Sequence, residues 1–322
     1  MLNSRGKLFI LVLVTFFGLE STIAQQDAQY TQYMYNTMSV NPAYAGSRGQ
    51  LSAAALYRSQ WVGLDGAPTT QTFNLHSPIR NSKVGYGLSI VNDRIGNGAV
   101  QETQFDGVVS YTVDVSLEGK LSFGLKLGGH LLNLDLTGLR QRGDPTFQEV
   151  IDTDNIENKF SPNVGLGMYY HTNKFYAGLS APNLLQTEHF DNSQRDANTV
   201  QFLSQERINF YLITGYVFDL NNNFKFKPAL LTKVVGGAPL QVDVSASFLF
   251  NDKFSFGAAY RWDAALSGMV GFQITDQFMI GLAYDKETTE LGQTRFNDGS
   301  FEVFLRYDLV KSFQKLVSPR FF

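Results

Sequence analysis

Hydrophobic and polar residues alternate with a period of two along most of the chain after residue 50. In residues 242–250, Val, Ala and Phe take the even positions, while Asp243, Ser245 and Ser247 take the odd ones. Residues 301–308 repeat the pattern with Phe, Val, Leu and Tyr at the odd positions. Alternation of this period predicts β-strands that have one apolar and one polar face.

Across the whole chain the pattern predicts about fourteen strands of roughly ten residues, an even number that is typical of bacterial membrane barrels. They lie near residues 51–60, 69–77, 83–92, 100–115, 119–134, 160–171, 174–181, 206–219, 224–235, 240–250, 253–262, 264–274, 277–285 and 299–308. We therefore expect an all-β fold, a transmembrane antiparallel β-barrel. Its closure removes the open sheet edges that lipid does not tolerate.

A soluble β-sandwich would alternate in the same way, so the connections have to distinguish the two folds. Tight connections rich in Asn, Asp and Thr follow even-numbered strands, at 173, 221–223, 251–252 and 275–276. The long connections 135–159, 182–205 and 286–298 all follow odd-numbered strands, although two odd connections, near 236–237 and 263, are also short. Short periplasmic turns and longer external loops of a barrel explain this bias, and a sandwich does not.

The first 24 residues are typical of a secretory signal peptide. An apolar run of twelve residues, Leu8 to Leu19, follows Arg5 and Lys7, and small residues precede a cleavage position near Ala24. Twelve residues are too few to span a bilayer core of about 30 Å. The expected organisation is a signal peptide (1–24), a periplasmic N-terminal segment that plugs the barrel or docks a partner (25–50), the barrel (51–308) and a periplasmic tail (309–322). The expected location is the outer membrane.

Composition agrees with an exported barrel. The chain has 322 residues and no cysteine, so no disulfide can stabilise it. Its 27 Phe and 15 Tyr suit strands that meet lipid, where aromatic residues line both interfaces. The 26 basic and 29 acidic residues nearly balance, and no basic stripe predicts a nucleic-acid partner.

No catalytic, cofactor or metal site is recognisable. The four histidines, at 76, 130, 171 and 189, lack a partner at metal-ligand spacing. We expect His130 and His171 to lie in the lumen or at an interface. A nucleophile elbow is absent, and a barrel would not provide the strand-to-helix turn that it needs. We therefore expect a protein without a cofactor that is not an enzyme.

Several segments resemble the PorP/SprF family, membrane proteins of type IX secretion and gliding motility in Bacteroidetes. The resemblance begins with residues 29–36 (QYTQYMYN) and 41–46 (NPAYAG), and continues with 57–64 (YRSQWVGL) and 66–70 (GAPTT). Residues 77–78, 92–96, 180–184 and 318–322 also fit, in the expected order. The family-motif residues are Asn41, Pro42, Ala43, Gly46, Arg58, Trp61, Gly63, Pro68, Pro182, Asn183, Pro319 and Phe322.

The resemblance implies a barrel that supports secretion or surface attachment of large proteins such as adhesins. Its expected partners are lipid, the C-terminal region of a secreted surface protein, and periplasmic and outer-membrane components of the type IX system. For the motif residues we expect structural roles ahead of direct partner contact. A porin-like channel for small solutes is the main alternative, because about fourteen strands leave room for either an open or a plugged interior. An outer-membrane enzyme is a third alternative, although no catalytic triad can be assembled from the sequence.

Overall fold

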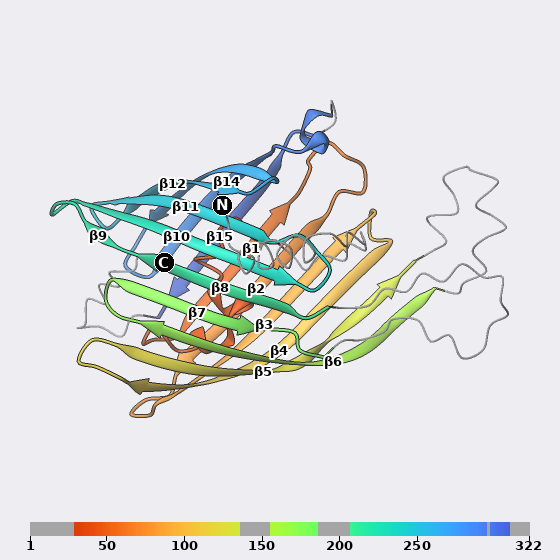
Figure 1. Cartoon of the computed structure of the whole chain (residues 1–322). Helices are drawn as coiled ribbons and strands as arrows, with labels where there is room; N and C mark the ends of the chain where they lie inside the picture. The colour runs from red at the N-terminus through yellow and green to blue at the C-terminus, as the bar shows by residue number, and fades with distance from the viewer. Residues whose placement is uncertain (1–28, 136–154, 186–206, 295–296, 310–322) are drawn as a thin grey trace, which may run out of the picture.

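The computed structural model describes residues 29–135, 155–185, 207–294 and 297–309, which form one antiparallel β-sheet (Figure 1). The strands are β1 (Ser52–Ser59), β2 (Thr69–Pro78), β3 (Val84–Ile95), β4 (Val100–Asp114), β5 (Lys120–Leu134), β6 (Ile156–His171), β7 (Phe175–Ala181), β8 (Asn209–Tyr216), β9 (Phe218–Asp219), β10 (Phe224–Val235), β11 (Gln241–Phe250), β12 (Phe254–Arg261), β13 (Ala265–Gln273), β14 (Phe278–Glu287) and β15 (Ser300–Asp308). No helix in these ranges is long and apolar enough to cross a membrane.

The sheet closes on itself as a barrel. Each strand pairs with its neighbour in sequence, and β1 pairs with β15 to complete the ring. Both β8 and β9 pair with β10, so these two segments are parts of one strand that is interrupted at Val217. The fifteen segments therefore occupy fourteen positions, which confirms the predicted barrel.

The two ends of the barrel differ in their connections. Residues 79–83, 115–119, 172–174, 220–223, 251–253 and 274–277 make one end, which we call the short-turn end. The other end, the long-loop end, carries residues 60–68, 96–99, 135–155, 182–208, 236–240, 262–264 and 288–299. The predicted parity of the connections is thus confirmed. Which membrane face each end meets stays a prediction.

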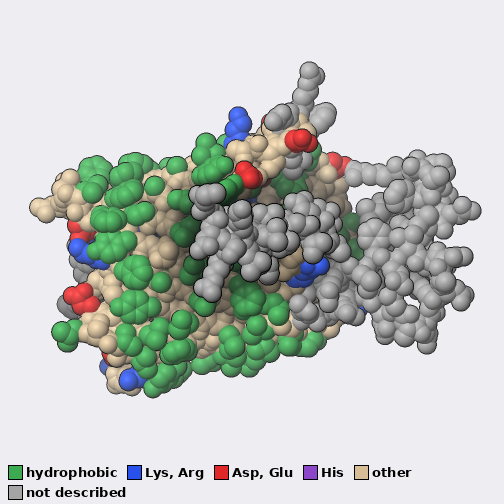
Figure 2. Space-filling view, viewed as in Figure 1, with side chains coloured by type: hydrophobic (Ala, Val, Ile, Leu, Met, Phe, Trp, Pro, Cys, Tyr) green, Lys and Arg blue, Asp and Glu red, His purple; other side chains and the backbone are tan. Residues whose placement is uncertain are grey.

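The apolar face of the strands points outward and the polar face inward. On β13 and β14, Leu266, Val270 and Leu282 are exposed, while Ser267 and Asp285 on the same strands are buried. In Figure 2, hydrophobic side chains cover the visible outer wall, and most charged side chains lie near its ends. This is the inverse of a soluble protein, as expected when lipid is the outer solvent.

The N-terminal segment Gln29–Gln50, which we call the plug, lies inside the barrel (Figure 1). It contains the short helix α2 (Thr37–Val40) and the 3-10 turn η1 (Pro42–Tyr44), and a second 3-10 turn, η3 (Glu290–Gln293), lies at the long-loop end. Buried residues of the plug and inward side chains of the wall form a core cluster that includes eleven wall positions. The wall members are Leu56, Val108, Tyr169, Tyr176, Tyr211, Ile213, Leu231, Ala259, Met269, Ala283 and Phe304.

Candidate functional site: the plugged lumen

A network of buried charges holds the first residues of the plug at the long-loop end. Arg58 of β1 lies 2.7 Å from Asp285 of β14 and 3.4 Å from Glu302 of β15. The backbone N–H groups of Thr31 and Gln32 donate to the two Glu302 carboxylate oxygens at 2.9 and 2.8 Å. The Thr31 hydroxyl donates to Asp285 and accepts from Arg58. We call Arg58, Asp285 and Glu302 the latch.

Because the latch is buried, its charges depend on the partners that the plug and the wall provide. Each of its three side chains is at most 1% exposed, so each charge has lost its hydration. A charge buried in this way needs close partners of opposite sign or hydrogen-bond donors. The latch has one cation for two carboxylates, and the plug backbone supplies the remaining donors to Glu302. The barrel wall is therefore electrostatically complete only when the plug is in place.

The middle of the plug fits against glycines of the wall. Asn41 donates from its amide to the Met168 carbonyl oxygen at 3.0 Å, and its side-chain oxygen accepts from the Ala43 N–H at 3.0 Å. The second bond caps η1, which begins at a proline, the residue favoured at that position. A Cβ on Gly124 would overlap the Ala43 backbone, and one on Gly167 would overlap the Asn41 side chain. Small wall residues thus make room for the plug.

The last residues of the plug are fixed at the short-turn end. The Gly46 N–H donates to His76 Nδ1 at 3.1 Å, and Ser110 donates to the Ala45 carbonyl at 2.6 Å. Arg48 forms an ion pair of 2.7 Å with Asp308. Gly46 has a φ of 74°, which glycine adopts without strain.

Three motif residues, Trp61, Gly63 and Pro68, lie in the rim loop 60–68. The Trp61 indole donates to Glu287 at 3.1 Å, and its backbone N–H donates to the Ser300 hydroxyl at 3.2 Å. Trp61 has a φ of 46°, a conformation that costs energy for a bulky residue and needs such support. The Pro68 carbonyl accepts from Gln60 at 3.0 Å, which closes the loop. These contacts hold the loop in one conformation on the rim.

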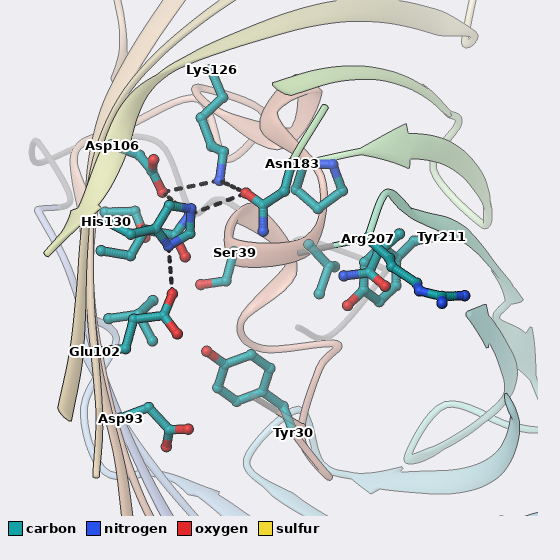
Figure 3. Close-up of a pocket in the computed structure, with 16 residues that line it drawn as sticks. Tyr30, Ser39, Asp93, Glu102, Asp106, Lys126, His130, Asn183, Arg207 and Tyr211 are labelled. Atoms are coloured by element: carbon teal, nitrogen blue, oxygen red, sulfur yellow. Dashed lines mark hydrogen bonds and ion pairs between the residues drawn. The ribbon is translucent and has the colours of Figure 1, made fainter. Parts of the chain in front are cut away.

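Pro182 and Asn183 border a polar cavity of about 80 Å³ between the plug and the wall. Figure 3 shows Asp93, Glu102 and Asp106 along one wall, with Tyr30 and Ser39 of the plug facing them. Two pairs of cavity side chains lie in direct contact. Lys126 lies 3.2 Å from Asp106 and donates to Asn183 at 2.9 Å, and His130 lies 2.6 Å from Glu102.

The structure sorts the motif residues into three groups. Asn41, Pro42, Ala43 and Gly46 belong to the plug. Arg58 borders the plug from the wall, and Pro182 and Asn183 border the cavity beside it from the connection that follows β7. The rim-loop residues are separate from these. Pro319 and Phe322 lie outside the described residues.

Sequence reasoning did not identify Asp285 or the plug-binding role of Glu302. The available signal was a charged residue at an inward position of a strand. That signal also marks Asp243 and Arg261, which pair with each other at 2.8 Å. It therefore indicates the lumen wall without indicating which charges contact the plug.

Among the described residues, no group of three or more His, Asp or Glu side chains could hold a metal ion. The arrangement supports binding and packing of the plug.

A closed sheet with an apolar outer wall, a polar inner wall and a filled lumen defines an outer-membrane β-barrel of the plugged kind. The family model of the type IX secretion system membrane protein PorP/SprF matches residues 22–307. The chain therefore belongs to this family, as its motif blocks suggested. No curated protein with significant similarity to the chain was found.

Several solved barrels are similar to the chain at low identity. The CymD monoaromatic hydrocarbon channel is 12% identical with a TM-score of 0.47, and the match covers 87% of this chain and 93% of that one. A FadL homologue of Pseudomonas aeruginosa is 12% identical with a TM-score of 0.44, covering 84% and 93%. The KdgM porin is 9% identical with a TM-score of 0.39, covering 82% and 99%.

Proposed function

We propose that this protein is a non-enzymatic outer-membrane barrel of the type IX secretion system that supports secretion or cell-surface attachment of large proteins such as adhesins. Beyond family membership, one observation supports the proposal: the plug fills the lumen and contacts the wall at positions all around the ring. Because the lumen is filled, the surfaces that can bind a partner are the rims of the barrel, and there is no open pore. The family provides the link to protein secretion.

In the proposed mechanism, the long-loop end faces outward and holds the C-terminal region of a secreted protein. The rim loop supports this role, because Trp61 and Pro68 are fixed by hydrogen bonds and present a preorganised surface. The short-turn end and the tail 309–322 would face the periplasm and meet other components of the system. Export by the segment 1–24 belongs to the same proposal.

A porin-like channel is the competing function. Its strongest support is the polar inner wall, which in an open barrel would line water. The plug argues against it, since Gln32, Asn41 and Ala43 are fully buried within the lumen. A channel would require the plug to leave or to rearrange.

The proposal is tested by deleting the gene in its host and measuring which proteins reach the cell surface. We expect one or more large surface proteins to be lost from surface-biotinylated fractions, while uptake of small solutes is unchanged. Complementation with the wild-type gene should restore display. Normal display of all surface proteins in the deletion strain would refute the proposal, and a selective loss of solute uptake would favour the channel.

A further inference from the structure

The outer wall has an apolar groove on β11, β12 and β13. Most outward positions of the wall carry large side chains, but Ala246, Ala258 and Gly268 face outward side by side. Ala246 pairs with Ala258, and Ala258 pairs with Gly268, so the three residues form one row across the strands. A Cβ added at Gly268 would meet no atom within 4 Å. The wall therefore recedes along this row.

Large apolar side chains border the groove. The rings of Phe248 and Phe256 stack with their centres 5.4 Å apart on the side nearer the short turns, and Val270 continues this border. Tyr284 is in register with Gly268 and closes the end of the row. Concave apolar surfaces of this kind bury more of a flexible apolar ligand than a flat wall does. The groove can therefore hold a lipid chain more tightly than the surrounding wall.

A cation lies beside the groove toward the long-loop end. Lys286 is exposed and is the next outward residue after Tyr284 on β14. Two residues of strand separate them, which corresponds to about 7 Å at roughly 3.3 Å per residue. The neighbouring carboxylates are engaged elsewhere, since Asp285 pairs with Arg58 and Glu287 accepts a hydrogen bond from an indole. The Lys286 ammonium is thus available to an external anion.

Aromatic residues on β12 indicate the depth of Lys286 in the membrane. Tyr260 is in register with Leu266, which pairs with Lys286, and Trp262 follows at the end of the strand. Both aromatic side chains are exposed. Exposed Tyr and Trp on a barrel wall lie at the level of the lipid headgroups. A lysine at this level extends its ammonium toward the phosphates, and the groove begins just below it.

We propose that the groove is a binding site for an anionic phospholipid. The phosphate binds Lys286, and an acyl chain lies on the row of Ala246, Ala258 and Gly268. Two observations favour a lipid as the occupant: the groove is continuous with the apolar wall that lipid covers, and the adjacent cation complements a phosphate in charge. The site adds to ordinary lipid contact a preference for a negatively charged headgroup. It does not depend on the proposed role in secretion.

Native mass spectrometry of the full-length protein in detergent tests the headgroup preference. Phosphatidylglycerol and phosphatidylcholine with the same acyl chains are added in equal amounts. We expect the wild type to retain the glycerol lipid about fivefold more than the choline lipid, the preference that one lysine near a lipid surface provides. In Lys286→Gln the two lipids should be retained equally.

Arg94→Gln is the matched control, because Arg94 is an exposed outward cation at the long-loop end of β3. This variant should keep the wild-type preference. Equal retention of the two lipids by the wild type would refute the proposal, and so would the same loss of preference in the Arg94 and Lys286 variants. The wild-type result decides the first point whether or not a variant folds.

Filling the groove tests where the acyl chain lies. Gly268→Leu should lower the retention of both lipids. Gly107→Leu is the control, because Gly107 faces outward on β4 between Leu88 and Leu127, and a Cβ there makes only ordinary contact. Unchanged retention by the Gly268 variant would overturn the proposal. A wild-type dimer that is lost in the Gly268 variant would also overturn it, since the groove would then be a contact between two copies of the chain.

Discussion

At the scale of single residues, the lumen is organised by pairs of buried charges. Arg58 and Glu302 face each other across β1 and β15 in register, and Asp243 and Arg261 do so across β11 and β12. Alternation along each strand predicts that such residues point inward. It does not predict their partners, since partners depend on the register of strands that are distant in sequence.

The latch predicts a large loss of stability when its cation is removed. In Arg58→Met the side chain keeps a similar volume, but Asp285 and Glu302 remain buried without the cation that pairs with both of them. Breaking one side of a buried ion pair costs about 3–5 kcal/mol. We expect a decrease of this size in the free energy of unfolding, measured by urea titration of the folded barrel in lipid vesicles.

Lys174→Met is the matched control for the latch. Lys174 pairs with Asp219 at 2.8 Å, but both side chains are about half exposed to solvent. Exposed pairs contribute about 0–1 kcal/mol, so this variant should unfold at nearly the wild-type urea concentration. Equal stability of the Arg58 and Lys174 variants would show that the latch does not hold the plug.

At the scale of elements, the plug differs from every strand around it. Its sequence has no sustained alternation, and Asn41-Pro42 and Gly46 indicate turns and breaks. These signals correctly predict that strand one begins after them. They do not predict that the segment enters the lumen, because that depends on space left by wall glycines on β5 and β6.

Displacing the plug should open a pore. In Gly124→Val the new side chain overlaps the plug backbone at Ala43, so the plug must shift away from the wall. We expect the wild-type protein in planar bilayers to show no large steady current and the variant to conduct steadily.

The corresponding change at an outward-facing glycine, Gly268→Val, is the control for this experiment. A Cβ at Gly268 meets no atom within 4 Å, so the variant should behave as the wild type does. A large steady current through the wild-type barrel would contradict the closed lumen. The same conclusion would follow if the Gly124 and Gly268 variants conducted equally.

At the scale of the whole molecule, the two faces of the sheet meet different surroundings. The outer face is apolar, and the polar inner face encloses the plug. Large apolar side chains cover the outer wall, where Leu282 of β14 is 47% exposed, and polar side chains such as Ser267 and Asp285 are buried inside. A soluble sandwich buries the apolar face of each sheet and exposes the polar face to water, whereas this sheet exposes its apolar face and buries its polar one. The stability of this fold therefore depends on the lipid that surrounds the outer wall.

A charge on the outer wall should destabilise the barrel strongly. Leu282→Arg places a cation near the middle of β14 on the lipid face, at a cost of about 2–4 kcal/mol if this position lies near the bilayer centre. Leu117→Arg is the control, because Leu117 is fully exposed in the turn 115–119. We expect urea unfolding in vesicles to show the loss only for the Leu282 variant. Equal stability of both variants would mean that β14 does not face lipid.

The sequence by itself determined the barrel, the number of strand positions and the parity of the connections. Period-two alternation and turn residues are local properties of the sequence. Because each strand pairs with the next one along the chain, these local properties are enough to predict the order of the strands in the sheet. The strand boundaries agree within a few residues, with β6 starting earlier at Ile156 and the eighth strand interrupted at Val217. Only the tertiary structure decided that the lumen is plugged, that Arg58 meets Asp285 and Glu302, and that the plug begins at the long-loop end. These features join residues more than two hundred positions apart, and they exist only once the ring has closed.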